Sequence, residues 1–280
     1  MGHGRSVATL VGLVIIGGIK RIAGVASRIV PVMAIIYCGG VLVILALHYN
    51  NIFDSFLSIF TGAFSLKAGF WGGFVTTMMW GIRRGLYSNE AGQGSAAMAH
   101  AAAKTEESIR EGIVAMMGPF VDTIVICSMT GIAILCTGVL GSAPDLTGVS
   151  LTRTAFEAGF AFYPQIGTFI VTVSVFFFAY STMVSWSYYG DRACEYILGK
   201  RAIRPYRWVY VFFVFMGSVL PLAAVWNIGD IALMMMSIPN LIAIILLSGK
   251  LKQMSKEYFS KTHLTYKQKF ADNDESSGTD

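Results

Sequence analysis

A polar segment at residues 89–95, with the sequence NEAGQGS, carries the side chains and glycines that a binding site for a small solute would need. It supplies two amides, a carboxylate and a hydroxyl. Its two glycines permit backbone conformations that leave main-chain NH and CO groups exposed. The candidate binding residues in this segment are Asn89, Glu90, Gly92, Gln93, Gly94 and Ser95.

The segment interrupts an apolar stretch, which indicates a transmembrane helix that is broken in the middle. Residues 68–79 are apolar with small residues for close packing, and AAMAHAAA after the segment is again strongly helix-forming. Such breaks are tolerated only where backbone is buried in protein or lines a wet cavity. The freed NH groups and positive dipole end of the second half-helix would suit a substrate carboxylate. The alternative is a cytoplasmic loop between two helices, which would leave residues 69–82 short for a span.

Charged residues also occur inside apolar runs. An arginine at the centre of a membrane helix costs about 2.5–3.5 kcal/mol, so Arg83 and Arg84 must face a cavity, a partner or the interface. Asp122 lies deep in its own helix and is either a functional carboxylate or a structural partner of one of these arginines. Asp230 is expected to cap the start of the last helix. The pair Pro239-Asn240 predicts a kink or local unwinding there.

A second polar cluster follows the apolar start of the run at residues 164–190. Thr182 and Trp186 are one helical turn apart and share a face, as do Ser181 and Ser185. Hydroxyls and backbone carbonyls are hard oxygen ligands that suit Na⁺, and a tryptophan one turn on could close a small pocket. The alternative is that these hydroxyls bond to their own helix or to a neighbouring one.

The composition indicates an all-α polytopic membrane protein. Of the 280 residues, 55% are hydrophobic and only 13% are charged, whereas soluble domains carry about 25% charged residues. About seven membrane helices are expected, one of them broken. They lie at residues 6–19, 29–49, 69–103, 112–138, 164–190, 208–226 and 229–249, with a turn at 227–230. No motif of a soluble enzyme, cofactor site or metal site is present, so the chain is not expected to be an enzyme.

Lysine and arginine set the expected orientation. Sixteen of the 21 basic residues fall in the connectors at 20–28, 104–111 and 191–207 or from Lys250 onward, so this side is assigned to the cytoplasm. This placement explains the charge of +5 without a nucleic-acid partner. Residues 1–250 form the expected transmembrane region, and 251–280 a disordered cytoplasmic tail. The first apolar run would start outside and is short for a span, which suggests that helices upstream of it are missing.

At GIRRGLYSNEAGQGSAAMAHAAAKT the sequence resembles the alanine or glycine:cation symporter family, also called the sodium:alanine symporters. Further matches are GGIKRIAGVASRIVPVMAIIY, FVDTIVICSMTG, FAYSTMVSWSYYG and GDIALMMMSIPNLIAIILLSG. The family is similar in architecture to the bacterial leucine transporter, with two inverted five-helix repeats and alternating access. By this resemblance, residues 69–103 correspond to the broken sixth helix and 164–190 to the eighth.

The resemblance also implies which residues bind. Amino-acid contacts carry over to Gln93 with Gly92 and Gly94, and to Thr182 and Trp186, while Ser181 and Thr182 match the hydroxyls of the sodium site. Asn89, Glu90 and Ser95 belong to the unwound signature. Family members are longer, and this chain corresponds to their part from about the fourth helix onward, so we expect an incomplete pocket. A fragment, a misassigned start and a truncated gene all fit this pattern.

The resulting expectation is a plasma-membrane symporter that moves a small neutral amino acid, alanine or glycine, together with Na⁺ and without a further cofactor. One alternative is a transport-inactive truncated membrane protein that only packs against other subunits. Another is a symporter of a more polar amino acid such as glutamine, since Gln93 places an amide where the family often has an aliphatic side chain. The choice between Na⁺ and H⁺ as coupling ion stays open.

Overall fold

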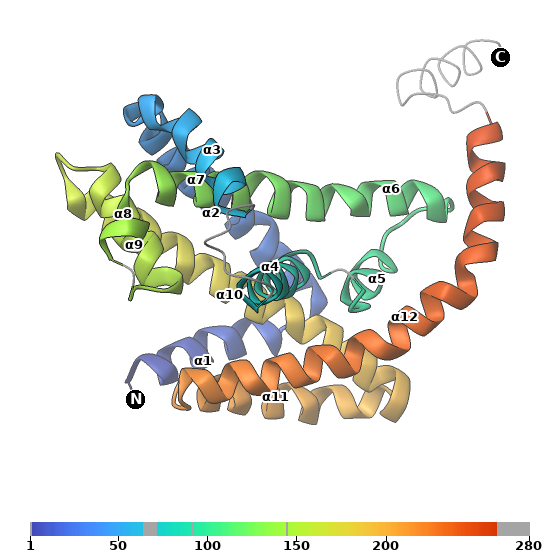
Figure 1. The fold of residues 1–280 in the computed structure, drawn as a ribbon. Coiled ribbons are helices and arrows are strands. Elements are labelled where there is room, and N and C mark those ends of the chain that lie inside the picture. The colour runs from blue at the N-terminus through green and yellow to red at the C-terminus, as the bar shows by residue number, and fades with distance from the viewer. Residues whose placement is uncertain (1, 64–71, 91, 144, 262–280) are drawn as a thin grey trace, which may run out of the picture.

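The computed structural model describes residues 2–63, 72–90, 92–143 and 145–261, and these are helical apart from turns and short connections (Figure 1). The first half holds α1 (Gly2–Ile15), α2 (Ile19–Leu47), η1 (Tyr49–Asn51), α3 (Ile52–Ala63), α4 (Gly72–Asn89), α5 (Ser95–His100), α6 (Ser108–Pro119) and η3 (Phe120–Cys127). The second half holds α7 (Ser128–Cys136), α8 (Val139–Ser142), α9 (Gly148–Gly159), α10 (Pro164–Leu198), η4 (Lys200–Ala202), α11 (Ile203–Gly217) and α12 (Leu222–Ser260).

Among the described residues, four helices are long and apolar enough to cross a membrane. They are the main part of α2, the continuous rod formed by α6, η3 and α7, and the helices α10 and α12. The chain is therefore an integral membrane protein built of helices. The expected number of about seven spans is not reached by this measure, because α1 and α11 have 14 and 15 residues and α4 carries the polar signature at its end.

Helix α10 runs through the centre of the molecule and contributes to both apolar cores. One core joins α10 to α1 and the start of α2 around Val11, Ile15 and Val184. The other joins α10 to α2, α7 and α9 around Val41 and Phe156. Burial of these side chains fixes the position of α10, so any binding group on α10 is held by packing on two sides.

A buried ion pair ties the last turns of α10 to α11. Asp191 is 1% exposed and accepts three hydrogen bonds from the Arg207 guanidinium, the shortest of 2.6 Å between Nη2 and Oδ2. Such a carboxylate tolerates burial only because the planar guanidinium satisfies both of its oxygens. The contact anchors α11, and through it the turn into α12, to the central helix.

Several boundaries differ from those expected from the sequence. The connectors expected at 50–68 and 139–163 contain the helices α3 and α9. The chain turns before α12 at residues 218–221, not at 227–230, because Pro221 cannot continue α11 but fits the position before a helix start. Asp230 therefore lies inside α12 and caps nothing. The helix also extends to Ser260, beyond the expected end at 249, while 262–280 are outside the described residues.

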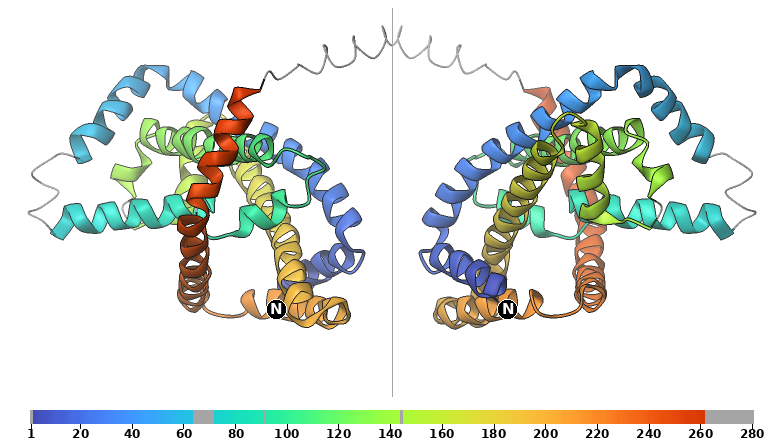
Figure 2. Two further views of the ribbon diagram at one scale, coloured as in Figure 1. Left: turned by 90° about the vertical axis from the view of Figure 1, so that its right-hand side faces the viewer. Right: turned by 90° about the vertical axis from the view of Figure 1, so that its left-hand side faces the viewer.

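Helix α12 is unbroken through Pro239 but bends along its length (Figure 1). The helix is not unwound at Pro239, and the loss of one main-chain hydrogen bond at a proline within a helix favours bending. In contrast, α4 does not run alongside the long helices. It is seen almost end on in Figure 1 and along its length in Figure 2. Its residues 75–84 are all exposed, so the described chain holds α4 mainly by its last turns.

Candidate functional site

The helix expected at residues 69–103 is interrupted as the sequence predicts. Helix α4 ends at Asn89 and α5 begins at Ser95. Between them Glu90, Gly92 and Gly94 have φ angles of 54°, 75° and 87°, which is left-handed backbone that no right-handed helix contains. We call residues 90–94 the break. The second half-helix ends at His100, not at 103, so with only six residues its dipole is a weak anchor for a carboxylate.

The carboxylate of Glu90 links both sides of the break to the central helix. Its Oε1 accepts a hydrogen bond of 3.0 Å from the indole Nε1 of Trp186 on α10. Its Oε2 accepts a hydrogen bond from the hydroxyl of Ser95, the first residue of α5. A left-handed non-glycine residue costs about 1–3 kcal/mol, so these two bonds account for a conformation that Glu90 would not adopt alone.

Gln93 is buried at the break with one half of its amide unused. Its side chain is 6% exposed, and Nε2 donates a hydrogen bond of 3.0 Å to the carbonyl of Leu86 on α4. Its Oε1 is buried and has no hydrogen-bond donor among the described residues. Buried polar atoms are nearly always paired, so this acceptor marks the place where a donor from a ligand would be stabilised.

Asp122 lies next to the last turn of α4. It belongs to η3, a π-helical stretch that follows Pro119, where the missing NH shifts the hydrogen-bond ladder. Oδ2 of Asp122 accepts a hydrogen bond from the hydroxyl of Ser88, whose oxygen also lies 3.4 Å from Sγ of Cys127. Asp122 is therefore bonded to the residue just before Asn89, and the pairing with arginine that the sequence left open does not occur.

Arg84 has aromatic partners instead of a carboxylate. Its guanidinium carbon lies 4.3 Å from the ring centre of Trp226 on α12 and 5.1 Å from that of Trp80. On the same side, the hydroxyl of Tyr87 donates a hydrogen bond to Oδ1 of Asp230. Cation–π contacts of this kind stabilise a guanidinium away from water. They also attach the end of α4 to α12.

A known protein family matches the chain over these same residues. The model of the sodium:alanine symporter family matches residues 1–272, which include the break and every helix described above. The chain belongs to this family. Its members are transporters that couple amino-acid movement to sodium, so the family is not a class of enzymes.

Relatives within the sodium:alanine symporter family are similar over most of this chain. The Sodium/alanine symporter AgcS of Methanococcus maripaludis is 44% identical over 257 residues, which is 91% of this chain and 56% of that protein. An uncharacterized transporter of Haemophilus influenzae is 42% identical over 264 residues, 93% of this chain and 57% of its own. The "Probable sodium/glutamine symporter GlnT" of Bacillus subtilis is 31% identical over 251 residues, which is 88% of this chain and 51% of that protein. The chain thus spans about half the length of these relatives.

The three predicted residues of α10 lie in different surroundings. Trp186 contacts the break through Glu90. Ser181 is buried, and its hydroxyl donates to the carbonyl of Phe178 at 3.0 Å and lies 3.8 Å from Sδ of Met33 on α2. Thr182 is exposed. The two hydroxyls expected to hold sodium therefore face different sides of α10.

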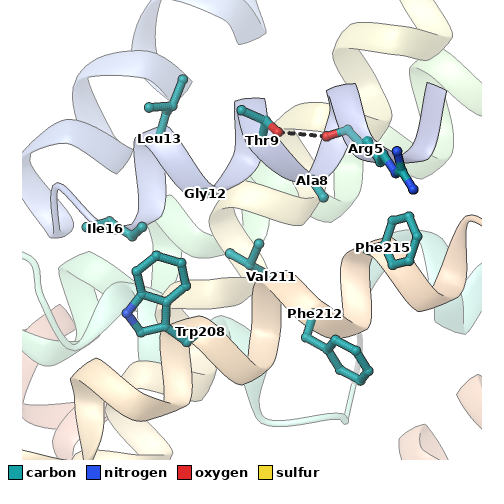
Figure 3. Close-up of a pocket in the computed structure, with 10 residues that line it drawn as sticks. All are labelled: Arg5, Ala8, Thr9, Gly12, Leu13, Ile16, Trp208, Val211, Phe212 and Phe215. Carbon is teal, nitrogen blue, oxygen red and sulfur yellow. Dashed lines mark hydrogen bonds between the residues drawn. The ribbon is translucent and has the colours of Figure 1, made fainter. Parts of the chain in front are cut away.

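Grooves elsewhere in the structure have a different character. Figure 3 shows one of about 580 Å³ between α1 and α11, lined by Trp208, Phe212 and other apolar side chains. Its polar lining consists of Arg5 and Thr9, and the hydroxyl of Thr9 is bonded to the carbonyl of Arg5. This groove suits lipid chains better than an amino acid, so the break remains the candidate site.

Residues that sequence reasoning did not place at the site come mostly from α12 and α6. The amide of Asn240 donates a hydrogen bond of 2.9 Å to the carbonyl of Gly92 in the break. Nδ1 of His100, at the end of α5, lies 2.6 Å from Oε1 of Glu111 on α6. In the sequence Asn240 was notable only beside Pro239. An amide within a long apolar run needs a partner, and that need was the available signal.

Proposed function

We propose that this chain forms the part of a secondary transporter that binds a small neutral amino acid together with Na⁺ and moves both by alternating access. Membership of the sodium:alanine symporter family supports the coupling of amino acid to sodium. The relatives' names support alanine as the first substrate to test. The proposed architecture is the part of the leucine-transporter-like inverted repeat from about the fourth helix onward. Residues 1–250 would lie in the plasma membrane with the tail in the cytoplasm.

The observation that carries the proposal is the buried Oε1 of Gln93, which lacks a donor among the described residues. The ammonium group of an amino acid carries three such donors, and its carboxylate would accept from main-chain NH groups around Gly92 and Gly94. Both glycines have left-handed backbone, which turns peptide groups out of the helical ladder. A site built from one amide and exposed main chain suits a zwitterion with a small side chain.

Trp186 would bound the amino-acid site on the side of α10. Its indole is fixed by Glu90, and its ring stacks edge-on against Tyr189 with centres 5.7 Å apart. Two aromatic rings held next to Glu90 would limit the room for a large side chain at the break. This arrangement supports alanine or glycine over larger amino acids, with Thr182 as a further contact from α10.

The sodium ion would be held by hydroxyls of Ser181 and Thr182. Thr182 is exposed, so its oxygen is accessible to a ligand, whereas Ser181 is buried and donates its proton to the carbonyl of Phe178, which leaves its oxygen lone pairs for a cation. Because Na⁺ takes several oxygen ligands, two hydroxyls on one helix need further oxygens from another segment. Sodium coupling is therefore proposed for the complete gene product. This includes any coding sequence found in frame upstream of Met1.

Uptake of labelled alanine in sodium and in choline medium tests the proposal. Cells lacking endogenous alanine uptake would express the gene product or a variant with Gln93→Leu, Thr182→Ala or Trp186→Ala. Each variant is expected to raise the apparent KM for alanine by about tenfold, which corresponds to about 1.4 kcal/mol of lost interaction. Thr9→Ala, which removes a hydroxyl of α1 far along the chain from the break, is the control. Unchanged KM in all three variants contradicts the site.

Glutamine is the second candidate substrate, since one relative is named a sodium/glutamine symporter. Gln93 is the residue that favours it, because an amide side chain can pair with the amide of the substrate. Competition of alanine uptake by excess glutamine should be lost in the Gln93→Leu variant if glutamine is bound in this way. An unaltered competition profile excludes that role. Absence of sodium-dependent uptake of either amino acid would favour a transport-inactive chain.

A further inference from the structure

Helix α12 meets the break at two consecutive residues. The side-chain Nδ2 of Asn240 donates to the carbonyl of Gly92 at 2.9 Å. A Cβ added to Gly94 would lie 3.2 Å from Cγ and Oδ1 of Asn240, and one added to Gly92 would lie 3.3 Å from Cδ2 of Leu241. Asn240 and Leu241 thus pack directly on the two left-handed glycines. The close approach uses the absence of side chains at both positions.

The hydrogen bond to Gly92 replaces a contact that the helix no longer supplies. Helix α4 has ended at Asn89, so carbonyls in the break are outside its regular ladder. Leaving a carbonyl without a donor costs about 1–3 kcal/mol where it is fully buried, and less at a half-buried position such as this one. The Asn240 amide is itself set in the apolar run MMMSIPNLIAIILL, where an unpaired polar group is equally unfavourable. Each group therefore stabilises the other.

The proline of α12 lies next to this contact, and the helix bends along its length (Figure 1). Pro239 directly precedes Asn240, and a proline within a helix removes one main-chain hydrogen bond and tilts the turns on either side. In the preceding turns, Trp226 stacks on the guanidinium of Arg84, and Asp230 accepts from Tyr87. One helix therefore touches α4 before the break and the backbone within it.

We propose that Asn240 is a positioning residue for the binding site: its amide holds the Gly92 carbonyl so that α12 fixes the backbone of the break around the amino acid. The inference deepens the proposed function and rests on it for the transport readout alone. Asn240 itself does not contact the amino acid. It acts through the orientation of the peptide groups at Gly92 and Gly94.

Three variants separate hydrogen bonding from packing. Asn240→Leu keeps the approximate volume and removes the donor. Asn240→Asp keeps the shape but donates only when its carboxyl is protonated, so the contact returns as the pH falls. Ser237→Ala is the matched control, because Ser237 is one turn earlier on α12 and its hydroxyl bonds to the carbonyl of Leu233 in the same helix.

The transport arm compares alanine uptake by these variants with that of the unchanged gene product at each pH. Asn240→Leu and Asn240→Asp should raise KM about tenfold at neutral pH, with the maximal rate per transporter at the surface retained. Acid pH should restore KM in Asn240→Asp and not in Asn240→Leu. A role in folding alone would lower the amount of transporter and leave KM unchanged, and that result overturns the inference.

Hydrogen exchange of the purified chain in lipid nanodiscs tests the same contact without transport. Peptides covering residues 90–95 should exchange several-fold faster in Asn240→Leu than in the unchanged chain, while Ser237→Ala matches the unchanged chain. Equal exchange in all three overturns the inference even if alanine is transported. If no alanine uptake is found, the proposed function fails, and faster exchange in Asn240→Leu would still support the contact between α12 and the break.

Discussion

The indole Nε1 of Trp186 donates a 3.0 Å hydrogen bond to the carboxylate of Glu90, and this contact joins the central helix α10 to the break between α4 and α5. The two residues are 96 positions apart in the chain. Because α10 is packed on two apolar cores, it provides a rigid support for the break. Any opening of the site that separates α4 from α10 must first give up this hydrogen bond.

Replacing Trp186 with phenylalanine should therefore loosen the break while keeping an aromatic ring beside it. Loss of one hydrogen bond to a charged group costs about 1.5–3 kcal/mol, so KM for alanine should rise by at least about tenfold. Uptake kinetics of Trp186→Phe measure this, with Trp208→Phe in the groove of α11 as the control. Identical kinetics for the two variants would show that the indole NH is not used.

Two variants of Glu90 separate the effect of its left-handed backbone from the effect of the hydrogen bonds to its carboxylate. Glu90→Gly and Glu90→Ala both remove the bonds to Trp186 and Ser95, but only glycine adopts a φ of 54° without cost. Both variants should lose uptake. In thermal unfolding, the Glu90→Ala variant should be less stable than the Glu90→Gly variant by about 1 kcal/mol. Full uptake by Glu90→Gly would refute the role of the carboxylate.

Variants of Asp122 test whether its carboxylate has a structural role or takes part in ion coupling. Asn retains an acceptor oxygen for the Ser88 hydroxyl, so Asp122→Asn should keep most uptake, whereas Asp122→Ala should reduce it about tenfold. Sodium dependence of uptake is measured for both variants. Equal loss in the two would mean that the negative charge itself is required, in favour of a direct role in coupling.

The ion pair between Asp191 and Arg207 should dominate the stability of the α10–α11 contact. Removing one partner of a buried pair costs about 3–5 kcal/mol because the other charge is left unpaired. Asp191→Ala should therefore lower the thermal unfolding midpoint clearly in detergent. Arg153→Ala, which removes a surface pair with Glu157, should shift it by the equivalent of at most about 1 kcal/mol. Similar shifts would contradict the assignment.

The sequence predicts the break itself because its determinants are local. Glycines at 92 and 94 and polar side chains around them disfavour a helix, whatever the rest of the chain does. Trp186 was placed at the site by resemblance to the family, and its position one turn after Thr182 is a simple consequence of helical spacing. What spacing could not show is that the carboxylate of Glu90 accepts a hydrogen bond from the indole.

The start of α12 shows where local signals fail. Asn227 to Asp230 carry the residue types of a turn, yet they lie within the helix. Asp230 accepts from Tyr87, and a Cβ on Gly229 would lie 3.6 Å from the same hydroxyl, so packing against α4 outweighs the weak helix propensity. Asn240 was missed for the same reason: its partner is 148 residues away in the sequence.

The measurement that tests the central claim most directly is protection of the break from hydrogen exchange by ligand. Hydrogen exchange of the gene product in nanodiscs is measured in the presence of Na⁺ alone, of alanine alone and of both together. We expect alanine together with Na⁺ to slow exchange in peptides covering residues 90–95 several-fold, with a much smaller effect of either alone and none in the Gln93→Leu variant. Sodium-dependent alanine uptake without any change of exchange at 90–95 would contradict the claim that the amino acid binds at the break.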